Sequence, residues 1–203
     1  MVSLSYATLD GVCRFEQDIK KSRFWVIAAP VTHADEAMAF FQTHHVAEAS
    51  HNCWAYKMGN AYRFNDDGEP GGTAGKPILQ AIEGQGLDGV AVLVVRWFGG
   101  VKLGAGGLIR AYGGSAAECL RMAPKRHIIA TQKVSFMCAY ADQGAVRQRL
   151  QLSDSTDVDV EFLPLGLRFT VSVPLDRLDE LQQHIADITR GKADWTIFDS
   201  DSA

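Results

Sequence analysis

The chain has 203 residues, of which 47% are hydrophobic and 22% charged, a composition typical of a globular protein with a core of ordinary size. The formal net charge of −4 excludes a general electrostatic attraction to nucleic acid, so any contact with phosphate would need a local basic patch. No uncharged apolar run is long enough to predict a transmembrane helix, and we expect no membrane association.

The first 121 residues alternate between strand-like and helix-like periodicity. Residues 90–95 form a continuous β-branched and leucine run, which is typical of a strand buried on both faces. Thr32 with Asp35 predicts a capping box, and Thr73 predicts the N-cap of a helix whose first turn holds Pro77. The predicted strands are residues 11–17, 22–31, 50–58, 61–64 and 90–95, and the predicted helices run through residues 34–41, 73–82 and 108–120.

The pattern changes at residues 122–127, where Pro124 and a basic polar stretch predict a linker between two domains, residues 1–123 and residues 124–203. Beyond it, the predicted strands are residues 128–139, 156–162, 167–173 and 195–198, and the predicted helices are residues 143–152 and 176–188. This βαββαβ order is that of a ferredoxin-like domain. The sequence therefore predicts an α+β protein with two domains.

Two glycine-rich segments, residues 64–77 and 96–108, are the most informative feature of the chain. Glycine loses more backbone entropy on folding than any other residue, so its concentration at two points indicates special dihedral angles or close backbone approach. We expect at least one of Gly104, Gly106 and Gly107 to show one of these features. Each segment also precedes a predicted helix and carries fixed charges, a combination that indicates a site.

The first segment is not a phosphate loop of the Walker type, because Pro70 and Pro77 replace the required glycine and hydroxyl residue. The second lacks the spacing of a dinucleotide-binding fingerprint. Helix N-termini nevertheless attract anions through unpaired N–H groups and a partial positive charge. We expect either an anion site at the two loops, or glycines that only permit tight turns and close packing. The candidate anion- or nucleic-acid-binding residues are Lys76, Arg96, Lys102, Gly104, Gly106, Gly107 and Arg110.

Other clusters allow further interpretations. Asp66, Asp67 and Glu69 could ligate magnesium, although acidic residues beside glycine and proline more often cap turns. His51 and Cys53, two apart in a predicted strand, are more typical of a core cysteine beside a satisfied histidine than of a zinc site or a nucleophile. The four cysteines are widely spaced, which favours reduced thiols in a cytoplasmic protein. No bound metal or cofactor is therefore expected.

Four motifs occur in a fixed order along the first half of the chain. They are Lys20-Lys21-Ser22-Arg23-Phe24, His51-Asn52-Cys53-Trp54-Ala55-Tyr56, Asp66-Asp67-Gly68-Glu69-Pro70-Gly71-Gly72-Thr73-Ala74-Gly75-Lys76-Pro77 and Val94-Val95-Arg96-Trp97-Phe98-Gly99-Gly100-Val101-Lys102-Leu103-Gly104. With this set, residues 10–121 resemble the IMPACT family, specifically its bacterial YigZ-like branch.

The resemblance implies an N-terminal domain like the second domain of ribosomal protein S5 and a C-terminal domain similar to a ferredoxin-like domain of elongation factor G. Eukaryotic members of the family act in translational control. They bind a ribosome-associated co-activator and so restrain a kinase that phosphorylates an initiation factor. No catalytic residue is carried over from the family, which favours a protein that is not an enzyme.

Together these observations lead to the hypothesis of a translation-associated regulatory or binding factor that contacts RNA phosphate or another anion through its glycine-rich loops. Its expected partner is RNA or a ribosome-associated protein. Two alternatives stay open, a metal-dependent enzyme acting on a phosphorylated or nucleotide substrate and a protein-interaction adaptor without a small ligand. RNA binding would weaken steeply with salt, a metal enzyme would lose activity with chelator, and an adaptor would show neither. The sequence does not predict the oligomeric state.

Overall fold

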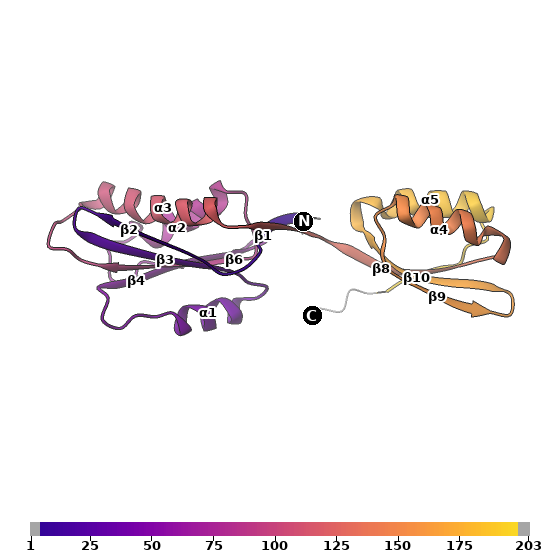
Figure 1. Cartoon of the computed structure of the whole chain (residues 1–203), viewed down its shortest axis with the longest axis horizontal. Helices are drawn as coiled ribbons and strands as arrows, with labels where there is room; N and C mark the ends of the chain where they lie inside the picture. The colour runs from indigo at the N-terminus through magenta and orange to yellow at the C-terminus, as the bar shows by residue number, and fades with distance from the viewer. Residues whose placement is uncertain (1–4, 199–203) are drawn as a thin grey trace. The chain divides into compact units, whose positions relative to one another are not determined.

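The chain folds into two compact units, each with its own sheet and hydrophobic core (Figure 1). The computed structural model describes residues 5–198, and the units are Met1–Ile128 and Ile129–Ala203. Both units pack helices against largely antiparallel sheets, which confirms the predicted α+β class. Among residues 5–198, no helix has both the length and the apolar character needed to cross a membrane.

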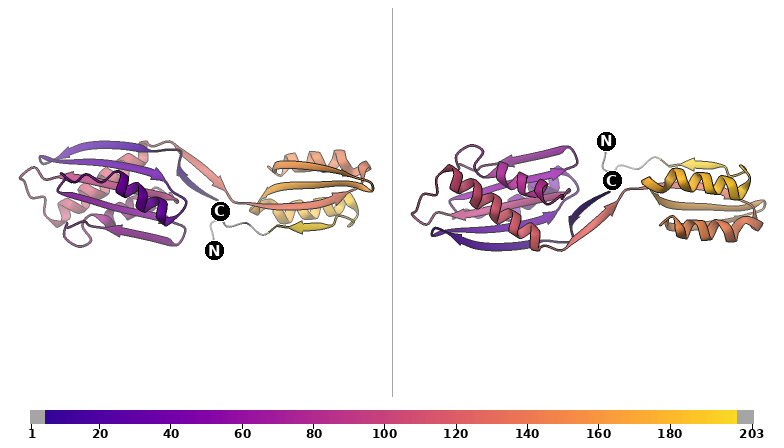
Figure 2. Two further views of the ribbon diagram at one scale, coloured as in Figure 1. Left: turned by 90° about the horizontal axis from the view of Figure 1, so that it is seen from below. Right: turned by 90° about the horizontal axis from the view of Figure 1, so that it is seen from above.

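The N-terminal unit is built on a five-stranded sheet whose neighbouring strands run antiparallel. In spatial order the strands are β2 (Cys13–Ile19), β3 (Ser22–Pro30), β6 (Val90–Trp97), β4 (His51–Met58) and β5 (Ala61–Asn65), and the helices are α1 (Ala34–Thr43), α2 (Gly75–Gly84) and α3 (Ala105–Met122). Helices α2 and α3 cover one face of the sheet and α1 covers the other (Figure 2). The central strand β6 therefore lies in the middle layer of three.

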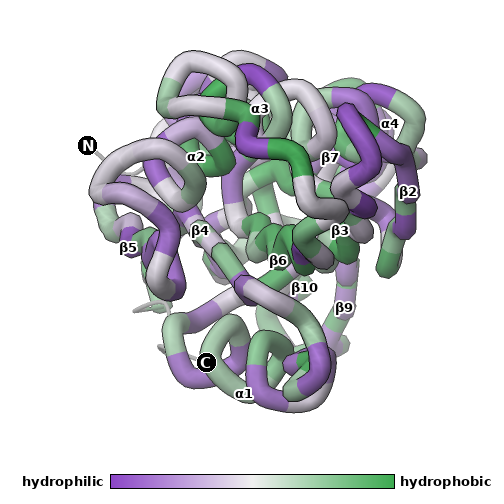
Figure 3. Tube along the Cα trace, turned by 90° about the vertical axis from the view of Figure 1, so that its left-hand side faces the viewer, coloured by the Kyte–Doolittle hydropathy of each residue, from purple (hydrophilic) through white to green (hydrophobic). Residues whose placement is uncertain are grey.

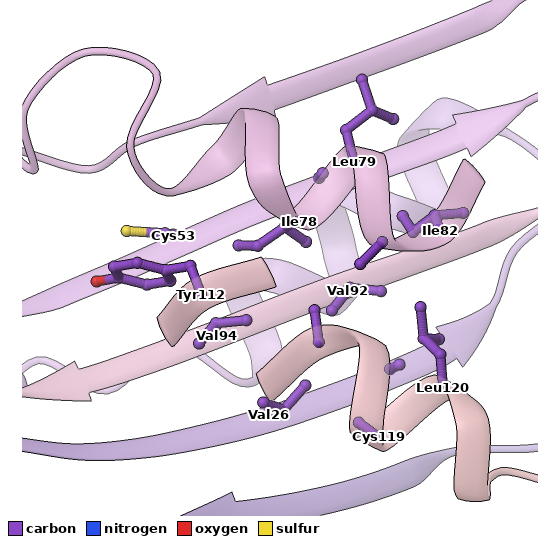
Figure 4. Close-up of a cluster of buried hydrophobic side chains, with 14 of the residues drawn as sticks. Val26, Cys53, Ile78, Leu79, Ile82, Val92, Val94, Tyr112, Cys119 and Leu120 are labelled. Atoms are coloured by element: carbon purple, nitrogen blue, oxygen red, sulfur yellow. The ribbon is translucent and has the colours of Figure 1, made fainter. Parts of the chain in front are cut away.

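The alternation of side chains along β6 divides the core of this unit in two. Val92 and Val94 belong to the cluster under α2 and α3, where Ile78 of α2 packs above them (Figure 4). Leu93 and Val95 belong to the cluster under α1, so apolar residues of β6 lie between the two helical layers (Figure 3). Burial of both faces explains the unbroken apolar run, since each such side chain contributes about 1.5–3 kcal/mol.

Two predicted helix starts are wrong in detail. Helix α1 has His33 as its N-cap, and the N–H of Thr32 donates to the Glu36 carboxylate at 2.7 Å, so the carboxylate partner is Glu36 and not Asp35. Helix α2 begins at Gly75 with Ala74 at the N-cap position, and the hydroxyl of Thr73 donates to the Pro70 carbonyl at 2.6 Å instead of capping the helix. The carboxylate of a distant residue caps α2 instead, as described below.

Part of the stretch predicted as a linker, residues 122–127, forms a strand. Lys125–Ile129 forms strand β7, which pairs with β1 (Ser5–Leu9), a strand that the sequence pattern did not reveal. The N–H of Asp10 donates to the Pro124 carbonyl at 3.0 Å and extends this pairing. The stretch looks like a linker because its side chains are mostly exposed. The domain boundary at residues 123 and 124 stays a prediction, to be tested by limited proteolysis.

The C-terminal unit has the predicted βαββαβ order, with strands in the antiparallel spatial order β11-β8-β10-β9. This is the ferredoxin-like arrangement, in which β10 separates the two strands that flank the first helix. Phe136 and Phe169 stack at 5.6 Å between ring centroids in its core. The elements are β8 (Thr131–Cys138), α4 (Gln143–Leu152), β9 (Thr156–Leu163), β10 (Gly166–Pro174), α5 (Leu178–Thr189) and β11 (Trp195–Ile197), with 3₁₀ turns at Tyr140–Asp142 and Leu175–Arg177.

Candidate functional site

The first glycine-rich loop uses one carboxylate to cap helix α2. Asp66 Oδ1 accepts the N–H groups of Ala74 and Gly75 at 2.9 and 2.8 Å, and Asp66 Oδ2 accepts the N–H of Gly72 at 2.8 Å. The first N–H groups of a helix have no partner inside the helix, so a carboxylate there satisfies them and also faces the positive end of the helix dipole. The start of α2 is therefore closed by the chain itself.

The carboxylate of Asp67 connects the same loop to the sheet by a hydrogen bond. Asp67 Oδ2 accepts the N–H of Asn52 in β4 at 2.5 Å, and the N–H of Asp67 donates to Asn65 Oδ1 at 2.6 Å. The loop also approaches β5 so closely that a Cβ at Gly75 would lie 2.7 Å from the Asn65 carbonyl oxygen. Glycine is required at this position because the loop and the strand share the space that a side chain would fill.

The third carboxylate, that of Glu69, lies at the centre of a buried polar cluster. Glu69 Oε1 accepts from Arg96 Nη1 at 2.6 Å and from the hydroxyl of Tyr112 at 2.7 Å, and the paired side chains of Glu69 and Arg96 are only 4% and 5% exposed. Arg96 Nη2 donates to Ser22 Oγ at 3.2 Å, and His51 Nε2 lies 3.7 Å from Glu69 Oε1. The cluster joins the first loop to β3, β4, β6 and α3.

Arg96 is therefore not the free cation that the sequence pattern predicts, because its charge is balanced by Glu69 in the protein interior. The alternation of side chains along β6 explains why Arg96 is buried. Along β6, Val92, Val94 and Arg96 point to the same face, so a side chain at the third position enters the core beneath α2 and α3. A buried arginine requires an acidic partner. The alternation in the sequence could have revealed the need for that partner, but not that Glu69 fills the role.

Cys53, which lies beside the cluster, and Tyr112, which belongs to it, are both held in their neutral forms. Burial raises the pKa of Cys53 well above its usual range, and burial likewise raises the pKa of Tyr112. The thiol of Cys53 donates to the Asp66 carbonyl at 3.1 Å, and its side chain lies next to the Tyr112 ring (Figure 4). A thiol with a raised pKa is a poor nucleophile, which agrees with the interpretation of Cys53 as a core residue.

The three carboxylates of the first loop do not converge on a common point for a cation. Each accepts N–H or O–H groups of the chain, and among residues 5–198 no group of three or more His, Cys, Asp and Glu side chains is placed to hold a metal ion. The arrangement is that of a loop which uses its acidic residues to fix its own shape.

The second glycine-rich loop has a different construction. Gly99 packs against the turn after β2, where any Cβ would overlap the carbonyl oxygen of Lys21. Gly104 has φ +72°, which confirms the expectation of a positive φ for at least one of the three glycines named above. Gly106 and Gly107 lie inside α3 and have no positive φ. Gly104 is also the N-cap of α3 and has no side chain to cap it, and among residues 5–198 no carboxylate is found that accepts the first N–H groups of α3 as Asp66 does for α2.

A pocket of about 310 Å³ opens at this uncapped helix start. Lys102 on its wall is exposed, whereas Arg96 is only 4% exposed and lies over the Phe98 ring at 5.5 Å. Among the described residues, Arg96 Nε is buried without a hydrogen-bond partner. Arg96 and Lys102 carry two positive charges and Glu69 carries one negative charge, so the pocket has an excess of positive charge beside the N–H groups of the first turn of α3. The lining includes Glu69, Pro70, Arg96, Phe98, Lys102 and Gly104.

The structure thus brings together three of the seven predicted site residues, namely Arg96, Lys102 and Gly104. Arg110 is exposed and lies against the first turn of α3, where its Nη1 would be 3.7 Å from a Cβ at Gly106. Lys76 is exposed on α2, whose N-terminus Asp66 closes, and does not line the pocket. Tyr112, which the sequence analysis treated only as an apolar helix residue, is a member of the buried cluster.

Another cavity, of about 320 Å³, lies on the α1 side of the sheet. Its lining includes Phe41, Trp54 and the carboxylate residue Asp67, with amide and imidazole side chains but no lysine or arginine. A cavity with a carboxylate and no cation does not suit an anion. The pocket at the start of α3 is therefore the better candidate for the site that the glycine-rich loops predict.

The fold and the pocket define a two-unit α+β protein with a small basic cavity at a helix N-terminus. Residues 20–120 match the family described as the Impact N-terminal domain. A Thermus thermophilus protein described as an IMPACT family member in the pol 5′ region is 46% identical over 175 residues, which cover 86% of this chain and 97% of the relative. The chain belongs to the IMPACT family.

Other similar proteins span most of the chain. The IMPACT family member YigZ of Escherichia coli is 32% identical over 86% of this chain and 89% of its own length, and YvyE of Bacillus subtilis is 34% identical over 94% and 89%. The crystal structure of a hypothetical protein is similar with a TM-score of 0.64 and 28% identity, covering 97% of this chain and 98% of the other. The two-unit architecture is therefore shared with a solved structure.

Proposed function

We propose that this protein is a translation-associated regulatory or binding factor of the cytoplasm, and that it contacts RNA phosphate through the pocket at the start of α3. The single observation that carries the proposal is the pocket at the start of α3, which is lined by two cationic residues, buried Arg96 and exposed Lys102. Cations that line a cavity attract an anion more strongly than cations on an open surface, because less water screens them there.

Three further features support a phosphate as the ligand. Lys102 supplies a point charge, the first N–H groups of α3 point out of the helix without an intrahelical partner, and the helix dipole places partial positive charge at the same end. Glycine at position 104 lets a ligand approach the backbone closely, because the residue has no side chain and no other atom lies within 4 Å of the place where a Cβ would stand. We expect Arg110, one turn further along α3, to contact a neighbouring phosphate of the same strand.

The link to translation rests on family membership, and the local character of the pocket fits the composition. A chain with a net charge of −4 has no general attraction to nucleic acid, so a basic pocket would give few phosphate contacts and moderate affinity. Such a contact suits a regulatory factor that binds and leaves RNA, rather than a protein that coats it.

The test is binding of a labelled single-stranded RNA oligonucleotide by fluorescence anisotropy at several salt concentrations. We expect affinity to fall steeply with salt. Lys102→Ala should weaken binding and flatten the slope of log K against log salt by about 0.7, the value for one phosphate neutralised on a single strand. Lys76→Ala is the matched control, because Lys76 is an exposed lysine in the first turn of a helix whose N-terminus is capped. It should leave both affinity and slope unchanged.

The results distinguish the proposed function from its two rivals. Equally weakened binding in the two lysine variants, or binding that does not respond to salt, would contradict the proposed pocket. Activity on a phosphorylated substrate that a chelator abolishes would support a metal-dependent enzyme. No RNA binding by the wild-type chain, together with a protein partner that survives purification, would support the adaptor.

A further inference from the structure

Two cysteines distant in the sequence meet in the N-terminal unit. The Sγ atoms of Cys13 and Cys119 lie 3.4 Å apart, although 106 positions separate the two residues in the chain. Cys13 is the first residue of β2, an edge strand of the five-stranded sheet, and Cys119 lies near the end of α3 (Figure 4). Both thiols are free, and the two sulfur atoms would need to approach by about 1.4 Å to reach a disulfide bond length.

The two cysteines differ in access and in acidity. Cys13 is only half-buried, whereas Cys119 is 2% exposed. The hydrogen bond from Cys119 lowers the pKa of Cys13, with help from backbone N–H groups and the charge of Arg14, and the same hydrogen bond raises the pKa of Cys119. The more accessible sulfur is therefore also the one that more readily becomes a thiolate, which is the reactive form.

We propose that Cys13 and Cys119 form a site of reversible oxidation, in which Cys13 reacts with a hydroperoxide and Cys119 resolves the product to an intramolecular disulfide. The pair has the arrangement of such a site, namely an accessible attacking thiol with a buried resolving thiol already in contact with it. This inference does not depend on the anion pocket, because neither cysteine lines it.

The chemistry is a two-step oxidation. The Cys13 thiolate attacks an oxygen of the hydroperoxide, the O–O bond breaks, and Cys13 becomes a sulfenic acid while the leaving oxygen departs as water or alcohol after protonation. Cys119 Sγ then attacks the Cys13 sulfur, the S–O bond breaks, and the thiol proton leaves with the hydroxide as water. The two thiols are oxidised by two electrons, and the peroxide is reduced by two electrons.

The disulfide would connect the edge strand β2 to the last turns of α3. Closing a chain segment of this length restricts the unfolded state strongly, so the oxidised protein should unfold at a higher temperature than the reduced protein. We expect the midpoint for the N-terminal unit to rise by about 5 °C or more. A thiol reductant should return the midpoint to its original value.

The experiment treats the full chain with hydrogen peroxide at neutral pH and maps its peptides without reduction. We expect a product lighter by two hydrogen atoms, with the peptides of Cys13 and Cys119 joined and those of Cys53 and Cys138 unchanged. Cys119→Ser should instead accumulate a sulfenic acid at Cys13, trapped by dimedone, and Cys13→Ser should leave Cys119 reduced. Cys138→Ser is the control and should form the disulfide like the wild type.

Peptide mapping of the wild-type chain shows whether Cys13 and Cys119 form a disulfide even where a serine variant folds poorly. A Cys13–Cys119 linkage that dithiothreitol reverses supports the proposal. Oxidation of Cys13 without a linkage, a linkage to Cys53 or Cys138, or disulfides only between two copies of the chain would overturn it.

Discussion

The two glycine-rich segments have similar compositions but end in different ways. The first folds back on itself, and the carboxylate of Asp66 accepts three N–H groups at the start of α2. In the second, Gly104 leaves the start of α3 uncapped beside a basic pocket. Glycine permits both constructions because it tolerates close packing and positive φ. The side chains beside the glycines decide which helix terminus is closed and which stays open.

We expect the largest loss of stability for a change at Glu69, the residue of the first loop whose carboxylate neutralises Arg96. Glu69→Ala would leave a buried cation without its partner and should lower the free energy of unfolding by about 3–5 kcal/mol. Urea denaturation measures the change. Glu161→Ala is the control, because its ion pair with Arg168 is about half exposed on both sides and should contribute less than about 1 kcal/mol. Equal destabilisation by the two variants would show that the buried pair has no special role.

Alanine substitutions at Gly99 and at Gly71 compare how closely the second and the first loop pack against their surroundings. Gly99→Ala should destabilise the protein by about 1–3 kcal/mol, because its methyl group would overlap the Lys21 carbonyl and force the backbone to shift. Gly71→Ala has no atom within 4 Å of the added Cβ and should be close to neutral. Thermal unfolding of both variants gives the comparison, and a neutral Gly99→Ala would mean that the second loop does not pack as described.

Substitution of Asp66 tests whether its carboxylate caps the start of helix α2. Asp66→Ala leaves the N–H groups of Gly72, Ala74 and Gly75 without their acceptor and should cost about 1–2 kcal/mol of stability. Amide hydrogen exchange should increase in the first turn of α2 while that of α3 stays the same. Unchanged exchange at α2 would contradict the assignment of Asp66 as the cap.

Two glycines at the start of α3 should respond in opposite directions. Gly104→Ala should destabilise by about 1–3 kcal/mol, because φ is +72° there and an L side chain rarely adopts that conformation. Gly106→Ala should stabilise by about 0.4–1 kcal/mol, since the position is helical and the added Cβ would meet only the end of the Arg110 side chain at 3.7 Å. Urea denaturation checks both signs, and destabilisation by both variants would show that the helix start is more crowded than described.

The sequence predicted the α+β class and the βαββαβ order because periodicity within one strand or helix is a local property. It missed the pairing of β1 with β7, since these strands come from opposite ends of the N-terminal unit and Lys125–Ile129 is polar and exposed. The glycines marked the right loops, but the pairing of Arg96 with Glu69 depends on how β6 packs against a loop 27 residues away. Such pairings become visible only when the register of the strands is known.

The same limit applies to the candidate site. Lys102 and Gly104 could be predicted, because they stand together in the sequence at a helix start. Lys76 has the same local pattern, yet Asp66 closes its helix, and no feature of the sequence told the two helix starts apart. The contact between Cys13 and Cys119 was equally hidden, since it joins an edge strand to a helix 106 positions later.

The most direct test of the difference between the two loops is a titration of the ¹⁵N-labelled chain with inorganic phosphate, followed through backbone amide shifts. We predict saturable shifts of the amides of Ala105, Gly106 and Gly107 at the start of α3, and none for Gly75 and Lys76 at the start of α2. Lys102→Ala should weaken the response of α3. Equal shifts at both helix starts, or no shift at α3 up to high phosphate concentration, would contradict the account.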